Sequence, residues 1–378
     1  MNIIRSLEAL HSPSQGTALA IGNFDGLHLG HQKILKSLVR EAEKRRFPSC
    51  VLTFSPHPER AFGPKNILML QTLEQRLEGI SRYGVDLTLI APFTREFAAL
   101  SPQKFVNKIL ADAFLAKVVV VGSDFRFGKN REGDIRLLRR LGAKCGYRVS
   151  PIPPVRRRGA VVSSSLIRAL IAQGRVGRAN ELLGRSYTVE GDVVKGENRG
   201  TRLGFPTANI ETPNEISPPG VFITLLEFIS ESEEFQRGSN SEDTDRKSRS
   251  EDMRRIQKFG TCPRALPRAH LWPSITNVGF KPTFRSGDTD HSGDTHKSNS
   301  GDTYRIQKFG TCPRAPTSPP FAIETHVLDF HKNIRDRSVR IHFLKKIREE
   351  KIFGSEGELI RRIREDEKAA RLYFLKHL

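Results

Sequence analysis

Near its N-terminus the chain reads Gly22-Asn23-Phe24-Asp25-Gly26-Leu27-His28-Leu29-Gly30-His31. The apolar run Ala18–Ile21 precedes this motif and predicts a buried parallel strand. The segment Gln32–Val39 follows it with apolar residues at helical spacing. His28 and His31 are therefore expected at the start of a helix, where unpaired backbone N–H groups and the helix dipole favour anions. The arrangement indicates a site for a nucleoside triphosphate whose α-phosphate is open to attack.

The glycines of this motif allow the backbone to approach a ligand closely. A His-x-x-His pair alone is more often a metal pair or two surface histidines, and a glycine-rich turn can lack chemistry altogether. The strand, the whole motif and the helix together resemble the HxGH nucleotidyltransferases. The Phe-Asp-Gly form is similar to the flavin-nucleotide adenylyltransferase half of bacterial bifunctional riboflavin kinase/FAD synthetases.

Length and composition indicate how many domains to expect and argue against membrane, zinc-binding and disulfide-rich classes of protein. A chain of 378 residues is expected to form two to three domains, each with its own core. No apolar run reaches the length of a membrane helix and the N-terminus lacks a signal-peptide core, so we expect a cytoplasmic protein without a membrane partner. The cysteines form no CxxC pair and predict neither a zinc site nor a disulfide framework. They are Cys50, Cys145, Cys262 and Cys312.

The net charge of +20 is unevenly placed. Lys and Arg outnumber Asp and Glu by 29 to 14 through Gly184, and by 33 to 28 after it. A basic first half suits polyphosphate ligands and would also suit nucleic acid. Because no zinc finger, RNP motif or basic recognition helix is found, we expect no nucleic-acid partner. The run Arg156–Arg158 is expected in a solvated loop, with contact to a phosphate as the alternative.

Strand-like and helix-like segments alternate up to about residue 150, which predicts an open parallel α/β sheet. The expected strands after the first are Ser49–Phe54, Leu87–Phe93 and Lys117–Gly122, and helical stretches include Leu73–Arg82 and Pro102–Phe114. Such sheets bind ligands at the carboxyl ends of their strands. Asn23–His31, Ser55–Pro58 and Gly122–Gly128 follow three of the strands and are expected at that edge.

A second motif, Ser163-Ser164-Ser165-Leu166-Ile167-Arg168, opens a helix expected to end near Gly174. Serines at a helix start are usually N-caps. The alternative is that Arg168, one turn into the helix, reaches a triphosphate docked on the helix end. The family carries Ser-Ser-Thr-x-Ile-Arg at this place, and Ser165 keeps the hydroxyl of the threonine that it replaces.

From Tyr187 the pattern changes to short strands without intervening helices, which predicts an antiparallel barrel. The expected strands are Tyr187–Gly196, Gly220–Ile229, Ile275–Phe280, Ile323–Phe330 and Ser338–Leu344. A capping box at Ser355 and Glu358 opens a final amphipathic helix that is expected to run to about Leu375.

Three segments of this half are similar to the riboflavin kinase domain of the same enzymes. They are Gly200–Ile210, with the distinctive Gly-Phe-Pro-Thr-Ala-Asn sequence, Asn277–Phe284 and Glu324–Phe330. The resemblance implies an α/β nucleotidyltransferase domain at residues 1–184 and a riboflavin kinase barrel with a terminal helix at residues 185–378.

Two stretches interrupt the resemblance and share a repeat. Arg255–Ala265 recurs identically at Arg305–Ala315, in a context that is rich in Ser, Asp, Thr and Arg and poor in apolar residues. Such a composition cannot form a stacked core, so we interpret residues 231–270 and 285–319 as insertions between strands rather than a solenoid. We expect them to be surface loops that proteases cut readily.

The resemblance implies a set of residues for the adenylyltransfer. His28 and His31 would donate hydrogen bonds to phosphate oxygens, and Arg168 would balance charge on the departing pyrophosphate. His57, between two prolines, is a further candidate or merely a turn histidine. The other expected ATP or flavin contacts are Asn23, Asp25, Gly26, Asp124, Ser164 and Ser165.

For the kinase step the resemblance places Glu324 as the base that takes the proton of the ribityl hydroxyl. A carboxylate in such a strand could instead simply face solvent. Thr207 and Asn209, two residues apart in an extended segment, offer oxygen ligands suited to Mg²⁺ and phosphate. The remaining expected ligand contacts are Gly204, Phe205, Pro206 and Arg348.

The resulting hypothesis is a bifunctional enzyme in which ATP phosphorylates riboflavin to FMN and a second ATP adenylates FMN to FAD, with release of pyrophosphate. One alternative is an adenylyltransferase alone, with a barrel impaired by the insertions. The other is a basic nucleic-acid-binding protein that keeps a nucleotide fold; salt-dependent binding of random oligonucleotides without ATP turnover would indicate it.

Overall fold

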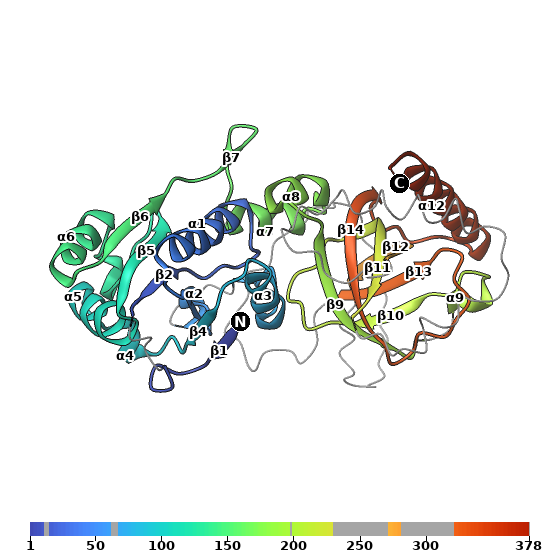
Figure 1. Cartoon of the computed structure of the whole chain (residues 1–378). Coiled ribbons are helices and arrows are strands. Elements are labelled where there is room, and N and C mark those ends of the chain that lie inside the picture. The colour runs from blue at the N-terminus through green and yellow to red at the C-terminus, as the bar shows by residue number, and fades with distance from the viewer. Residues whose placement is uncertain (11–14, 62–66, 197–198, 230–270, 281–320, 378) are drawn as a thin grey trace, which may run out of the picture.

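The structure is a computed structural model in which two domains lie side by side, joined by short helices (Figure 1). It describes residues 1–10, 15–61, 67–196, 199–229, 271–280 and 321–377. The two expected insertions, the repeated segments, Cys262 and Cys312 lie outside these residues, as does the end of the Asn277–Phe284 motif.

The N-terminal domain contains a sheet of six strands in the order β1-β4-β3-β2-β5-β6. Every neighbouring pair is parallel, which confirms the predicted open parallel sheet. The strands are β1 (Asn2–Ile4), β2 (Thr17–Ile21), β3 (Ser49–Phe54), β4 (Leu87–Ala91), β5 (Ala116–Gly122) and β6 (Arg148–Ile152). β2 and β3 are buried throughout, because apolar cores cover both faces of the sheet.

Helices cover the two faces. One core packs α1 and α3 against the sheet, and the other packs α5, the π-helical stretch and α6 against its opposite face. The helical elements are α1 (Leu29–Arg45), α2 (Pro58–Ala61), α3 (Leu73–Ser81), α4 (Arg95–Ala98), α5 (Pro102–Phe105), a π-helical stretch (Val106–Ala113), a 3-10 turn (Lys129–Arg131) and α6 (Ile135–Cys145). The helical segment expected at Pro102–Phe114 is present, but after Phe105 it widens to π-helical geometry.

A projecting hairpin and two helices connect the domains (Figure 1). They are the short strands β7 (Arg156–Arg157) and β8 (Ala160–Val161), followed by α7 (Ser164–Ala172) and α8 (Val176–Leu183). The arginines of the hairpin are exposed, and Arg158 pairs with Glu181 of α8 at 2.7 Å. The run is thus exposed to solvent as predicted, but it lies in a short hairpin whose first strand is β7 rather than in a loop.

The C-terminal domain is a closed barrel in the order β10-β13-β12-β11-β14-β9, and every neighbouring pair is antiparallel. Its strands are β9 (Tyr187–Val194), β10 (Ala208–Glu211), β11 (Gly220–Phe228), β12 (Leu271–Phe280), β13 (Phe321–Val327) and β14 (Ser338–Arg348), with the helical turn α9 (Arg199–Arg202) before β10. The predicted antiparallel barrel is confirmed, although β10 was expected only as an extended segment.

Helix α12 (Glu356–His377) packs on the outside of the barrel, where Ala370 and Phe374 meet Val221 and Ile223 of β11. The predicted capping box is half right. The Ser355 hydroxyl accepts the Glu358 N–H at 3.3 Å, but the Glu358 carboxylate accepts from Gly354 N and Lys351 Nζ rather than from Ser355 N.

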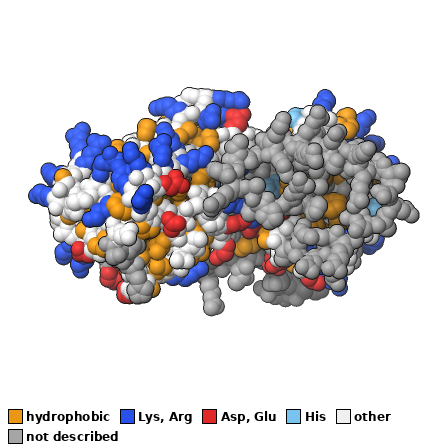
Figure 2. Space-filling model, in the orientation of Figure 1, with side chains coloured by type: hydrophobic (Ala, Val, Ile, Leu, Met, Phe, Trp, Pro, Cys, Tyr) orange, Lys and Arg blue, Asp and Glu red, His pale blue; other side chains and the backbone are white. Residues whose placement is uncertain are grey.

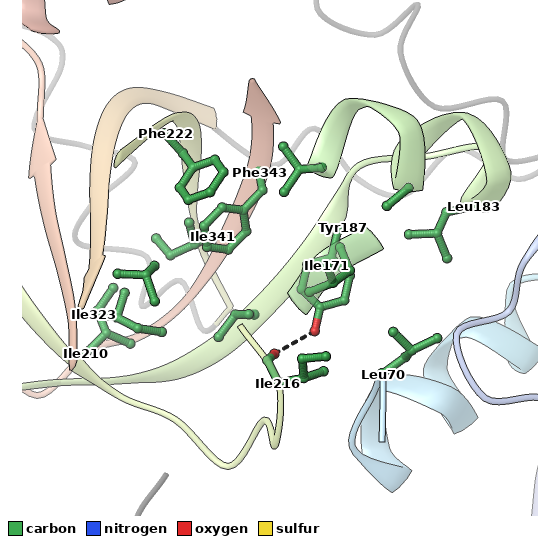
Figure 3. Close-up of a cluster of buried hydrophobic side chains, with 14 of the residues drawn as sticks. Leu70, Ile171, Leu183, Tyr187, Ile210, Ile216, Phe222, Ile323, Ile341 and Phe343 are labelled. Atoms are coloured by element: carbon green, nitrogen blue, oxygen red, sulfur yellow. Dashed lines mark hydrogen bonds between the residues drawn. The ribbon is translucent and has the colours of Figure 1, made fainter. Parts of the chain in front are cut away.

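The interior of the barrel continues into the domain junction as one apolar core (Figure 3). Leu70 of the N-terminal domain, Ile171 of α7 and Leu183 of α8 belong to the same buried cluster as the inward side chains of the barrel. The fully buried Tyr187 donates its hydroxyl to Ile216 O at 2.7 Å within this cluster. The two domains are therefore held together by shared apolar packing.

Candidate active sites

The N-terminal site lies where the strand order of the sheet reverses. From β2 the chain adds β3 and β4 on one side, and β5 then pairs with the other side of β2. Open α/β sheets bind ligands outside the carboxyl ends of their strands at such a point. The motif after β2 and Gly122–Gly128 after β5 both begin here, and Asp124 is exposed to solvent.

His28 is the N-cap of α1. Its Nδ1 accepts hydrogen bonds from Gly30 N at 3.2 Å and His31 N at 3.3 Å. Burial lowers the pKa of the imidazole from 6.5 to about 4, so the ring is neutral at pH 7. Because Nδ1 accepts, the single proton lies on Nε2, which leaves His28 as a fixed hydrogen-bond donor.

His31 stacks on His28, with ring centroids 3.7 Å apart and planes inclined by 16°. Burial lowers the pKa of His31 well below 6.5, and the neighbouring His28 lowers it further. Its Nδ1 is buried without a hydrogen-bond partner in the part of the chain that the structure describes. The helix therefore begins with two stacked neutral imidazoles.

Asp25 and Arg168 form a buried ion pair beside this helix start. Arg168 Nη2 lies 2.6 Å from Asp25 Oδ2, and the Asp25 side chain is 2% exposed. Asp25 Oδ1 also accepts from Leu70 N at 3.0 Å, while Arg168 Nε donates to Leu68 O at 2.8 Å. Burial raises the pKa of Asp25 and the Arg168 charge opposes that rise. Gly26, next to Asp25, is buried.

The three serines before Arg168 have different environments. Ser163 caps α7 by accepting from Leu166 N at 3.3 Å, as expected for a serine at a helix start. The Ser164 hydroxyl donates to Asp25 O at 2.9 Å and so ties α7 to the first motif. Ser165 is exposed in the first turn of the helix.

Asn23 and His57 meet across the ends of β2 and β3. The Asn23 amide nitrogen lies 2.9 Å from His57 Nε2, and His57 Nδ1 accepts from Glu59 N at 3.3 Å. Burial, followed by the charge of Arg168, lowers the pKa of His57 to about 4. Both predicted residues thus lie at the same sheet edge as the histidine motif.

In the barrel, strand pairing places Asn209, Glu324 and Arg348, three residues predicted for the kinase step, in one row across neighbouring strands. Asn209 of β10 pairs with Glu324 of β13, which pairs with Asn277 of β12. Asn277 pairs with Val221 of β11, and Val221 with Arg348 of β14. We call these five residues the register row; neighbours are one strand spacing apart, about 4.8 Å.

The register row lies on the outer face of the barrel. Ile210, Ile323 and Val278, which adjoin its members along the strands, belong to the inner core, and side chains alternate between faces. Glu324 is exposed and Asn209 half-buried. Three residues predicted from separate motifs, Asn209, Glu324 and Arg348, therefore share one face of the barrel.

The loop before β10 is packed around two glycines. A Cβ at Gly196 would lie 1.8 Å from Asn209 Nδ2, and one at Gly200 would lie 2.8 Å from Thr207 Oγ1 and 2.4 Å from Phe205 O. A Cβ at either position would clash with these atoms, so glycine allows Thr207 and Asn209 to pack closely against the loop. Gly204 and Pro206 are exposed, and Pro206 O lies 2.8 Å from His326 Nδ1.

Each half of the chain is similar to a known protein family. Residues 10–166 match a family model described as FAD synthetase, and residues 183–374 match one described as riboflavin kinase. The bifunctional riboflavin kinase/FMN adenylyltransferase of Escherichia coli K12 is 30% identical over 99% of this chain and 98% of its own. The protein so named from Pseudomonas fluorescens is also 30% identical, over 98% and 97%. The chain belongs to the bifunctional riboflavin kinase/FMN adenylyltransferase family.

A solved structure described as a macrolide-efflux protein from Streptococcus pneumoniae matches with a TM-score of 0.72 and 23% identity, over 98% of both chains. At that identity it supports the fold alone.

ATP is a substrate of both activities of the family. Among the described residues, no helix could span a bilayer and no three or more His, Cys, Asp or Glu side chains group as metal ligands.

Two further residues at these sites were not predicted. Arg76 of α3 is 4% exposed and donates to Asn23 O at 2.8 Å and Phe54 O at 3.2 Å, so it joins the ends of β2 and β3. Burial lowers its pKa. Its only signal in the sequence is a charge on the apolar face of that helix. Asn277 stands in the register row, and its Oδ1 is buried without a partner among the described residues.

Arg348 holds the terminal helix. Its Nη2 pairs with the nearly buried Asp366 of α12 at 2.8 Å, and its guanidinium lies 5.5 Å from the Phe353 ring. A cavity of about 540 Å³ opens here between the end of β14 and α12, lined in part by Glu350 and Arg361. The predicted contact of Arg348 with a ligand stays a prediction.

The surface of the N-terminal domain is basic. On the face drawn in Figure 2, Lys and Arg side chains gather over the N-terminal domain. This distribution agrees with the charge excess of the first 184 residues. A positive surface on this domain favours the approach of polyphosphates such as ATP and of FMN.

Proposed function

We propose that the barrel of this family member phosphorylates riboflavin at the register row and that the N-terminal domain adenylates FMN at the histidine motif. Residues 1–184 and 185–378 would each carry one activity. The observation that carries the proposal is that Arg168 pairs with Asp25 beside the histidine motif, while Asn209 and Glu324 pair on the outer face of the barrel. We place both steps in the cytoplasm, where ATP is available; cell fractionation tests this location.

In the adenylyltransfer, an FMN phosphate oxygen attacks the α-phosphorus of ATP, and the bond to the β-phosphate oxygen breaks to release pyrophosphate. His28 would donate its Nε2–H to an oxygen of the reacting phosphate, next to the positive end of α1. Burial keeps the ring neutral, so the donor stays in one tautomer at pH 7. His31 supports this orientation by stacking on the ring.

Arg168 would carry the positive charge of this site. Its Nε and Nη2 are engaged by Leu68 O and Asp25, and Nη1, which has no partner among the described residues, would donate to a phosphate. Asp25 fixes the guanidinium, so little order has to be gained when ATP binds. The side chain of Ser165, exposed at the start of α7, offers a further hydroxyl to the same phosphates.

In the kinase step, the ribityl hydroxyl attacks the γ-phosphorus of ATP and ADP leaves. Glu324 would accept the proton of that hydroxyl. Its exposed position on the outer face allows a substrate to reach it, and Asn209 and Asn277 stand beside it on the neighbouring strands. The buried Oδ1 of Asn277 lacks a donor among the described residues, and we assign it to a substrate hydroxyl.

Mg²⁺ fits the donors next to Glu324. Thr207 provides a hydroxyl and Asn209 an amide oxygen, both of the hard oxygen type that Mg²⁺ takes together with substrate phosphates and water. When bound, Mg²⁺ would neutralise charge on the phosphates of ATP. The glycines at 196 and 200 leave room for these two side chains beside the loop that precedes β10.

The test uses purified protein with riboflavin, ATP and MgCl₂, followed by chromatographic separation of FMN and FAD. The parent enzyme should form both. His28→Ala should accumulate FMN, and Glu324→Gln should form FAD only when FMN is supplied. Parallel loss of both activities in either folded variant would contradict two separate sites.

A further inference from the structure

Glu215, in the connection between β10 and β11, reaches from the barrel to the N-terminal domain. Its Oε2 accepts a hydrogen bond from Met69 N at 2.8 Å, and its Oε1 pairs with Arg60 Nη1 at 2.6 Å. Both partners belong to the N-terminal domain. The neighbouring Asn214 donates to Gln75 Oε1 at 2.9 Å, so this part of the barrel is docked at several points.

The segment around Met69, which binds Glu215, also contacts the Asp25–Arg168 pair of the adenylyltransfer site. Leu70 N donates to Asp25 Oδ1 at 3.0 Å, and Leu68 O accepts from Arg168 Nε at 2.8 Å. Three consecutive residues, 68–70, therefore bind Arg168, Glu215 and Asp25 in turn. The Glu215 carboxylate therefore binds Met69, which lies between the two residues, Leu68 and Leu70, that contact Arg168 and Asp25.

A second contact from the barrel side reaches the histidine motif itself. Arg185 Nη2 donates to Gly26 O at 3.1 Å, and Gln32 Nε2 on α1 donates to Leu183 O at 2.6 Å. Arg185, two residues before β9, thus contacts the loop between β2 and α1, and the end of α8 contacts α1. The histidine motif is therefore in contact with the first residues of the kinase domain through Arg185.

We propose that Glu215, a residue of the kinase domain, is a positioning residue for FMN adenylyltransfer. It would act by holding residues 68–70 in place, so that Asp25 and Leu68 O aim the Arg168 guanidinium at the phosphates. This inference rests on the proposed role of Arg168. A shift of about 1 Å in such a group costs on the order of 100-fold in rate, so a remote anchor can matter for turnover.

The alternative is that Glu215 only stabilises the junction between the domains. The chain contains its own internal control, because riboflavin phosphorylation takes place at the register row on the outer face of the barrel. A loss of folded protein would lower both activities, whereas a loss of Arg168 positioning would lower only the adenylyltransfer.

The experiment compares Glu215→Ala, Glu215→Gln and Arg168→Ala in the full-length enzyme. FMN-to-FAD and riboflavin-to-FMN rates are measured on the same preparations. Glu215→Ala should lower kcat/KM for adenylyltransfer about 10- to 100-fold and leave phosphorylation within about twofold. Glu215→Gln keeps an oxygen for Met69 N–H and should restore most of the activity. Glu181→Ala, which removes a carboxylate paired with Arg158, is the matched control and should change neither rate.

The double variant separates positioning from general stability. In the Arg168→Ala background, Glu215→Ala should have no more than a twofold further effect, because the group that it positions is gone. An undiminished effect in that background, or unchanged adenylyltransfer in Glu215→Ala alone, would overturn the role of Glu215. Full adenylyltransfer by Arg168→Ala would overturn instead the function proposed for Arg168, and with it the route by which Glu215 acts.

Discussion

Replacing His28 separates its two roles at the start of α1. Its Nδ1 caps the helix, and its Nε2 is the proposed phosphate donor. His28→Asn keeps a side-chain oxygen that can accept the same backbone N–H groups, since asparagine is among the best N-caps. His28→Ala removes the cap as well. Both variants remove the Nε2 donor, so both should lower FAD formation from FMN about 100- to 1,000-fold.

The stability of the variants should diverge with pH. His28→Ala should lower the free energy of unfolding by about 1 kcal/mol at pH 7, while His28→Asn should leave it nearly unchanged. The pKa of His28 falls from 6.5 to about 4 on folding, so between these values the unfolded chain binds a proton that the folded chain does not. The parent therefore loses stability as the pH falls from 6.5 towards 4. Between pH 7 and pH 5 this loss is roughly 2 kcal/mol from His28 alone.

His28→Asn has no such proton uptake, so its stability should fall less than that of the parent by roughly 2 kcal/mol between pH 7 and pH 5. A variant that has lost adenylyltransfer would thereby resist acid better than the parent. Urea unfolding at the two pH values, followed by circular dichroism, measures the difference. The single tryptophan, Trp272, lies in β12 of the barrel, so its fluorescence reports the other domain and serves as the control.

Hydrogen exchange of the Gly30 and His31 amides tests the cap directly, since both donate to His28 Nδ1. Their protection should persist in His28→Asn and drop in His28→Ala. An unchanged pH dependence in His28→Asn would refute the buried neutral imidazole, and parental FAD formation would refute the donor role.

Three further outcomes are expected. Glu324→Gln should slow riboflavin phosphorylation about 100- to 10,000-fold while supplied FMN is still adenylated; near-parental phosphorylation would rule out this base. Asn277→Leu should weaken phosphorylation about 3- to 10-fold, the effect of one substrate hydrogen bond, as steady-state kinetics on riboflavin would show. Replacing residues 231–270 and 285–319 with short Gly-containing turns should preserve kinase activity, because the flanking strands pair directly; an unfolded barrel in circular dichroism would contradict this.

The buried strands of the N-terminal sheet were predictable because burial on both faces makes them continuous apolar runs. β3 has the predicted bounds, and β2 and β5 begin one residue earlier than expected. β1, β6 and β10 were not predicted as strands. β1 and β10 have only three and four residues, and in β10 the polar Asn209 and Glu211 occupy the outer face, which leaves too few apolar positions to show a period. β6 is an edge strand of five residues that contains Pro151, a residue that is rare in strands.

The histidine motif was predictable because its chemistry is local. A strand, a loop and a helix start are neighbours in sequence, so their residue types alone indicate an anion site. The contacts that orient the site were not predictable. Arg168 meets Asp25 across 143 positions of sequence, and Arg76 joins two strand ends from a helix. Such bonds follow from the packing of the domain and have no signature in residue spacing.

The proposed kinase site depends on strand register rather than on any local motif. Asn209, Asn277, Glu324 and Arg348 come from four strands, and only pairing decides that they share one row. If one strand shifted its register by one residue, its side chain in the row would point into the barrel core instead of outward. Glu227 pairs with Leu271, next to residues 230–270, and Phe280 pairs with Phe321 on either side of residues 281–320. The strands that carry Asn277 and Glu324 are thus in register up to the points where those segments begin and end, so the row is set by pairing and not by the length of chain between the strands.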